Sequence, residues 1–113
     1  ITILREMKSI GYIEGSSIVS RSGLIIASTI PTRTGAEKFA ATSALMIKSV
    51  EIALEKLRKG TFNHIILNTS TKRVVAIPAG KKAILVCLIK PQSNLGLMLL
   101  EIKKAAHKIE KTI

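Results

Sequence analysis

The sequence contains no aspartate and no tryptophan, and its seven glutamates stand against eighteen lysines and arginines. Without aspartate, the chain lacks the usual Mg²⁺ ligand and many of the acid/base pairings used in catalysis. The single cysteine excludes both a disulfide framework and a thiolate metal cluster. Only three aromatic residues are present, so the stacking platforms typical of single-strand nucleic-acid binders are missing.

The remaining candidates for catalytic chemistry have simpler structural interpretations. Glu51 and Glu55 lie one helical turn apart on a lysine-rich polar face, which indicates a solvated charge pattern. His64 and His107 have no histidine or cysteine at ligand spacing. Cys87 lies inside the longest apolar run, the environment of an inert core thiol. No phosphate-loop motif is present. We therefore predict no enzyme activity, no catalytic residues, no cofactor and no metal.

Long hydrophobic runs are also missing. The longest wholly apolar stretch, residues 83–89, is far too short to cross a bilayer, and no charged-then-apolar signal segment opens the chain. We therefore predict a cytoplasmic protein without a membrane span. With 113 residues the chain can bury one core, and we predict a single domain over residues 1–113.

The central feature of the sequence is residues 34–60, which are expected to form one long helix. Thr34 and Glu37 have the spacing of a capping box, and Gly60 can supply the C-terminal stop. The broad apolar stripe of this helix comprises Ala36, Phe39, Ala40, Ser43, Met46, Ile47, Val50, Ala53, Leu54 and Leu57. Its first half is apolar nearly all round, which favours a second covering by another subunit. A surface helix with a few stray apolar residues is the alternative.

The rest of the chain alternates between helical and strand patterns. The expected helices cover residues 1–10, 34–60 and 94–113, and the expected strands cover residues 15–20, 24–29, 63–69, 72–77 and 82–89. Residues 83–89 are apolar on both faces, which places the last strand centrally, between two layers. Gly23 is expected in a turn that needs positive φ. The order is α-β-β-α-β-β-β-α, and it predicts an α/β chain, an α+β sandwich whose five-stranded antiparallel sheet has helices on both faces.

The net charge of +11 is unevenly distributed. Residues 61–93 contain five basic residues and no acidic one, whereas residues 1–31 are close to neutral. A basic patch can bind nucleic acid, an anionic membrane surface or an acidic protein. Charge alone does not choose between these partners.

Five short stretches carry a resemblance to a known family. They are GSSIV at 15–19, RSGL at 21–24, FAA at 39–41, VAIPAG at 75–80 and NLGL at 94–97. In this order and spacing they resemble the Roadblock family, small domains related to dynein light chains and to bacterial and archaeal regulators of small GTPases. The resemblance implies strand order 2-1-5-4-3 in a profilin-like fold, with the long helix on one face and the terminal helices on the other.

The resemblance also implies a dimer in which the third strands pair edge to edge and the long helices pack antiparallel. The dimer-interface residues that we expect are Phe39, Ala40, Ala41, Ala44, Leu45, Ile47, Ile65, Ile66 and Leu67. A homodimer is our prediction, and a heterodimer with a sibling subunit stays open. Pairing of the third strands would also relieve an exposed sheet edge.

By the same resemblance, the function implied is a non-enzymatic scaffold that binds a Ras-like small GTPase and biases its nucleotide state or localisation. The nucleotide would belong to the GTPase. The basic residues available for partner contacts are Arg21, Arg33, Lys72, Arg73, Lys81 and Lys82. The alternative is a small nucleic-acid-binding dimer of the chromatin-protein type, which the net charge favours and for which we expect weak, non-specific binding.

Overall fold

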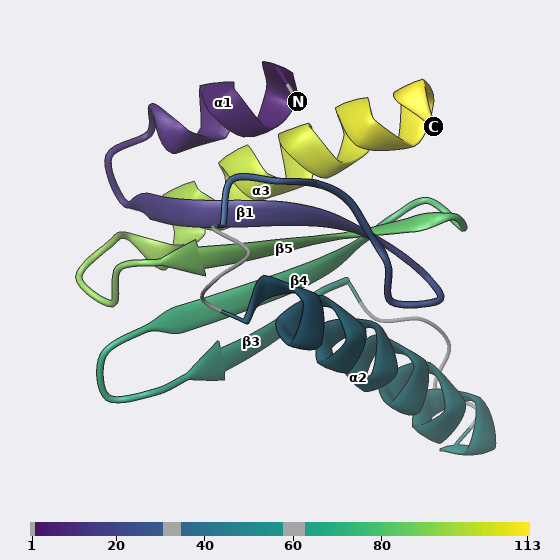
Figure 1. The fold of residues 1–113 in the computed structure, drawn as a ribbon. Helices are drawn as coiled ribbons and strands as arrows, with labels where there is room; N and C mark the ends of the chain where they lie inside the picture. The colour runs from purple at the N-terminus through teal and green to yellow at the C-terminus, as the bar shows by residue number, and fades with distance from the viewer. Residues whose placement is uncertain (1, 31–34, 58–62) are drawn as a thin grey trace.

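The computed structural model describes residues 2–30, 35–57 and 63–113, and within them the predicted element order is present (Figure 1). The helices are α1 (Thr2–Lys8), α2 (Ala36–Leu57) and α3 (Leu95–Thr112), and the strands are β1 (Ile13–Ser20), β2 (Ile25–Ser28), β3 (Ile65–Asn68), β4 (Arg73–Ala79) and β5 (Ala83–Ile89). The strands form one antiparallel sheet in the order β2-β1-β5-β4-β3. The predicted fold class and strand order are confirmed.

Several element ends differ from the predictions by a few residues. One such difference is in β4, which runs through Pro78 to Ala79, two residues past its predicted end at Ile77. β3 pairs with β4 only as far as Ala76, so Pro78 needs no N–H donor on that side. The predicted helix cap Thr34 and the predicted stop Gly60 lie outside the described residues.

The sheet separates two apolar cores. α1 and α3 cover one face, and α2 covers the other (Figure 1). β5 is central, and six of its seven residues are buried, as the apolar run predicts. Cys87 is among them, and burial raises the pKa of its thiol, which keeps the sulfur protonated and unreactive.

α3 begins where its sequence signal predicts. Asn94 is the N-cap, and its side-chain oxygen accepts a hydrogen bond from the backbone N–H of Leu97 at 3.1 Å. The buried residues of α3 recur at helical spacing and face the sheet: Met98, Ile102, Ala105, Ala106 and Ile109. This capping and packing fix α3 across the sheet face opposite α2.

The β1–β2 turn packs closely against α2, and Gly23 makes this possible. Its φ is 95°, as predicted, and a Cβ added there would lie 3.1 Å from the Cα of Ala41. We expect Gly23→Ala to lower the free energy of unfolding by about 1–3 kcal/mol, because it adds backbone strain and a clash with helix backbone. Urea denaturation measures this loss. Gly11→Ala is the control, since a Cβ there meets nothing within 4 Å; equal stabilities of the two variants would contradict the prediction.

Candidate interaction surfaces

α2 is longer than the sheet face that it covers. Its 22 residues span about 33 Å, whereas the seven residues of β5 span about 23 Å. All buried residues of α2 lie between Ala36 and Ile47, and the C-terminal half projects past the sheet (Figure 1). Leu57, at the end of α2, is 65% exposed. Apolar surface therefore continues beyond the intramolecular core.

One flank of α2 faces β3 and carries an apolar strip. Phe39 and Ile65 pack against the same core cluster, and helical spacing places Met46 and Val50 on the flank of Phe39. Leu67 lies on the same face of β3 as Ile65 because side chains alternate along a strand, and it is half-exposed. We define the β3-side surface as Phe39, Met46, Val50, Leu57, Ile65 and Leu67.

The β3-side surface borders an open strand edge. β3 is the last strand in the sheet order, and its outer backbone has no strand partner among the described residues. An exposed edge strand is an aggregation hazard that proteins usually cover. An apolar strip beside such an edge has the character of a subunit interface.

The opposite flank of α2 faces the β1–β2 turn and carries a second apolar strip. Leu24 is 70% exposed and Leu45 is 64% exposed. A groove of about 600 Å³ is lined by Gly23, Leu24, Ile25, Glu37 and Ala41. We define the hairpin-side surface as Leu24, Ala41, Leu45 and Ile52, all of them exposed.

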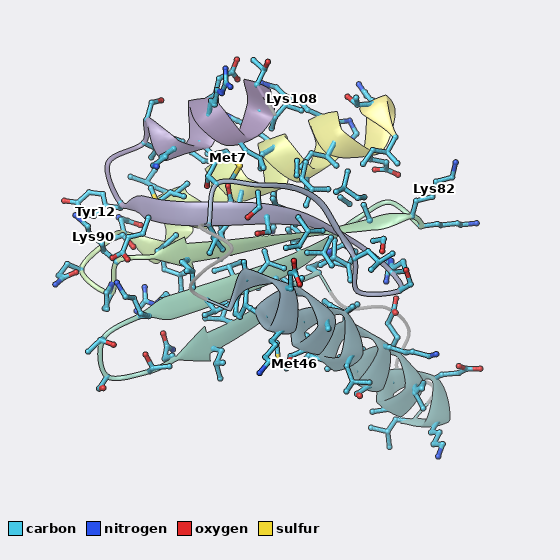
Figure 2. All side chains as sticks on the ribbon, in the orientation of Figure 1. Met7, Tyr12, Met46, Lys82, Lys90 and Lys108 are labelled. Carbon is cyan, nitrogen blue, oxygen red and sulfur yellow. The ribbon has the colours of Figure 1, made fainter. Side chains whose placement is uncertain are left out.

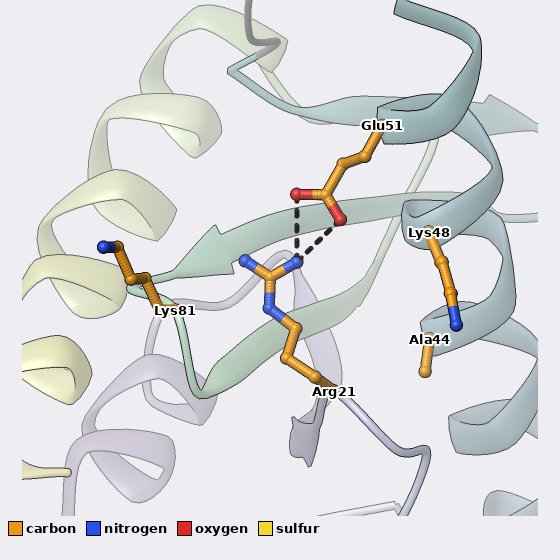
Figure 3. A pocket seen from close by; sticks show the side chains of 5 residues that line it. All are labelled: Arg21, Ala44, Lys48, Glu51 and Lys81. Carbon is orange, nitrogen blue, oxygen red and sulfur yellow. Dashed lines mark hydrogen bonds and ion pairs between the residues drawn. The ribbon is translucent and has the colours of Figure 1, made fainter. Parts of the chain in front are cut away.

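A positively charged depression of about 390 Å³ adjoins the hairpin-side surface. Its lining residues are Arg21, Ala44, Lys48, Glu51 and Lys81 (Figure 3). Arg21 Nη1 donates to both carboxylate oxygens of Glu51, at 3.1 and 3.2 Å, and Nη2 donates to the carbonyl oxygen of Gly80 at 2.8 Å. Arg21 thus ties the β1–β2 turn to α2 and to the β4–β5 turn. One carboxylate among three cations leaves the depression positive.

The family model of the Roadblock/LC7 domain matches residues 2–89. This chain belongs to the Roadblock/LC7 family. The uncharacterized protein MJ1340 of Methanocaldococcus jannaschii is 31% identical to it over 108 residues, which cover 96% of this chain and 94% of that protein. The family model therefore confirms the resemblance stated above.

Solved structures share the fold of this Roadblock/LC7 domain. Myxococcus xanthus MglB has a TM-score of 0.90 at 18% identity, with 98% of this chain and 91% of that chain covered. Acanthamoeba castellanii profilin II has a TM-score of 0.67 at 16% identity, with 98% and 96% covered. The profilin-like arrangement is therefore confirmed as the fold.

Four of the predicted interface residues are occupied within the domain itself. Ala40, Ala44 and Ile47 are buried between α2 and the sheet. Ile66 packs on the other sheet face, against the core under α1 and α3. The small side chains of Ala40 and Ala44 let α2 lie close to the sheet. Ala40, Ala44 and Ile47 are at most 5% exposed and Ile66 is partly buried. A contribution of these four residues to a dimer interface stays a prediction.

The other five predicted interface residues divide between the two surfaces. Phe39, Ile65 and Leu67 belong to the β3-side surface, whereas Ala41 and Leu45 belong to the hairpin-side surface. Met46, Val50 and Leu57 complete the β3-side surface, although the sequence pattern placed them in the core stripe. The length of α2 relative to the strands separates Val50 and Leu57 from the core, since both follow Ile47, the last buried residue of the helix. Met46 lies beside the core, on the flank of Phe39.

The predicted basic contact residues lie at two opposite ends of the sheet. Arg21, Lys81 and Lys82 lie in the β1–β2 and β4–β5 turns, which meet because Ser20 pairs with Ala83. Arg33 lies outside the described residues.

At the other end, in and beside the β3–β4 turn, the two basic residues are already engaged. Lys72 forms an ion pair with Glu14, and Arg73 Nε donates to the side-chain oxygen of Asn68 at 2.8 Å. The five of these residues that the structure describes therefore do not form one basic face.

The described ranges contain no cluster of three or more His, Cys or Glu side chains that could hold a metal ion. Glu51 is engaged by Arg21, and His107 lies on the exposed side of α3, 4.0 Å from Glu110. Among the helices that the structure describes, none has the length and apolarity to cross a membrane. The features of the described residues that could serve binding are the two apolar strips and the basic depression.

Proposed function

We propose that this Roadblock/LC7 protein is a non-enzymatic regulator that forms a homodimer and binds a Ras-like small GTPase. The observation that carries the proposal is the pair of unpartnered apolar strips on opposite flanks of α2. A single partner on one flank would leave the other strip exposed. Two strips therefore suit two partners: a second copy of the chain and another protein.

The second copy fits the β3-side surface. A two-fold axis beside β3 would pair the two β3 strands antiparallel and extend the sheet to ten strands. The same operation would bring the β3-side strips of the two α2 helices together and bury them. A solved structure of a fold relative is described as MglB with a tetrameric arrangement, which supports self-association in such proteins.

The GTPase fits the hairpin-side surface, because this strip stays exposed in the proposed dimer. Leu24 and Leu45 supply apolar anchors, and the depression around Arg21 supplies positive charge that would steer an acidic partner. Regulation would then operate through differential affinity for the two nucleotide states of the partner's switch loops. The partner would hold the nucleotide and the catalytic groups.

We expect the purified dimer to retain a Ras-like GTPase from the same cell differently in its GTP-loaded and GDP-loaded forms, because only differential binding can shift a population. Pull-down with both loaded forms measures this. Equal retention of the two forms by every such GTPase offered would contradict the proposal.

Duplex DNA is the control ligand for the alternative function. The net charge of +11 favours some binding, but the basic residues at the two sheet ends do not form one track. We therefore expect weak binding that falls steeply with salt. Tight duplex binding at physiological salt would favour nucleic-acid function over GTPase regulation.

A further inference from the structure

The outer side of α3 combines exposed leucines with lysines. Leu97 is 58% exposed and Leu100 is 50% exposed, one helical turn apart near the start of the helix. Further along, the lysines Lys103, Lys104 and Lys111 are exposed. These residues lie away from the buried stripe of α3, so packing against the sheet does not explain the leucines.

α1 lies beside α3 and extends this surface. Both helices cover the sheet face opposite α2 (Figure 1), and Lys108 lies on the outer side of this layer (Figure 2). The two helices carry six cations and three carboxylates, a net charge of +3: Arg5, Lys8, Lys103, Lys104, Lys108 and Lys111 against Glu6, Glu101 and Glu110. We call this surface, with Leu97 and Leu100, the α1/α3 face.

The ion pairs on the α1/α3 face leave its lysines available. Lys104 Nζ lies 3.8 Å from Glu101, and Lys108 Nζ lies 3.9 Å from Glu6. All four side chains are at least 42% exposed. Such long, solvated pairs contribute little and exchange readily for other anions.

We propose that the α1/α3 face binds an anionic membrane surface. Helices bind in this way when apolar side chains enter the headgroup region while lysines on the same side contact anionic lipid. A membrane explains both halves of the face, because phosphate groups attract the lysines and the interface accepts Leu97 and Leu100. A nucleic-acid backbone would use the lysines and leave both leucines in water.

The position of the face fits this role, since α2 on the opposite side stays free to bind proteins. In the proposed homodimer the two-fold axis beside β3 would be perpendicular to the ten-stranded sheet. The α1/α3 faces of both copies would therefore lie on the same side of that sheet. Two faces on one membrane would bind more tightly than one, by avidity. This doubling rests on the proposed dimer, whereas binding by a single face does not.

Co-sedimentation tests the proposal with vesicles of phosphatidylcholine, pure or containing about a third phosphatidylserine. We expect the protein to sediment with the phosphatidylserine vesicles at physiological salt and to stay in solution with the pure ones. A variant with Lys103, Lys104 and Lys111 changed to glutamine should bind at least about tenfold more weakly, since each basic residue near such a surface changes affinity roughly fivefold. The double variant Leu97→Ser, Leu100→Ser should also bind more weakly.

The matched control changes Lys38, Lys48 and Lys56 to glutamine, an equal loss of charge confined to exposed positions on α2. This control should bind vesicles as the unmodified protein does. An equal loss in the control would show attraction by net charge alone and overturn the proposal. The proposal would also be overturned if the serine variant kept full vesicle binding, or if duplex DNA displaced the protein from vesicles at equal phosphate concentration.

Circular dichroism and thermal melting check that each variant is folded. GTPase pull-down with the same variants separates this proposal from the GTPase proposal.

Discussion

Leu67→Glu should convert the homodimer into a monomer, whereas Leu45→Glu should leave it a dimer. Both changes replace an exposed leucine with glutamate, but Leu67 lies on the β3-side surface and Leu45 on the opposite flank of α2. Placing an unpaired carboxylate in a buried seam costs about 3–5 kcal/mol, and two-fold symmetry introduces the charge twice. We therefore expect at least about a hundredfold weaker dimerisation of the Leu67 variant.

Sedimentation velocity at micromolar concentrations measures the effect on dimerisation. Thermal melting checks that the variant is folded, which we expect because an exposed leucine can be replaced without disturbing the monomer core. A monomeric unmodified protein would refute the homodimer itself. A Leu45 variant that dissociates as fully as the Leu67 variant would move the interface to the hairpin-side flank.

The sequence predicts most of the fold because the signals that determine it are local. The turn at Gly23 is recognised from single residues and their neighbours, and the same signals place the cap of the last helix at Ser93 or Asn94, of which the structure has Asn94. The central place of β5 follows from an apolar run with no polar face. The strand order required the family resemblance, since periodicity does not say which strands are neighbours.

The surfaces are harder to predict because they depend on how far one element covers another. Helical periodicity groups Ile47 with Leu57, yet Ile47 is fully buried while Leu57 is 65% exposed. The difference arises because α2 extends past the sheet, and no residue pattern in the helix records where the sheet ends. Small residues pose a similar problem: Ala40 and Ala44 suit a close helix partner or a close sheet, and the sheet is what they contact.

Arg21 illustrates a contact that sequence reasoning could not assign. Its partners, Glu51 and Gly80, lie 30 and 59 residues away in the chain. The pairing exists because Gly23 lets the β1–β2 turn approach α2 and because β1 and β5 are neighbours in the sheet. The sequence indicates only a basic residue in a turn, whereas in the fold Arg21 lines a positively charged depression.

The same Leu45→Glu variant that keeps the dimer should lose binding to the GTPase. Removing a central apolar anchor typically costs about 2 kcal/mol or more, roughly thirtyfold in affinity, and the new carboxylate would also repel an acidic partner.

Lys48→Glu, at the edge of the basic depression, should chiefly slow association and weaken the salt dependence of binding. Calorimetry and stopped-flow mixing measure these effects with a GTPase that the unmodified dimer retains. Lys90→Glu, which removes an exposed lysine at the end of β5 remote from the β1–β2 turn, is the charge-matched control. If Leu45→Glu bound that GTPase with unchanged affinity, the hairpin-side surface would not be its docking site, because a buried anchor cannot become a carboxylate without cost.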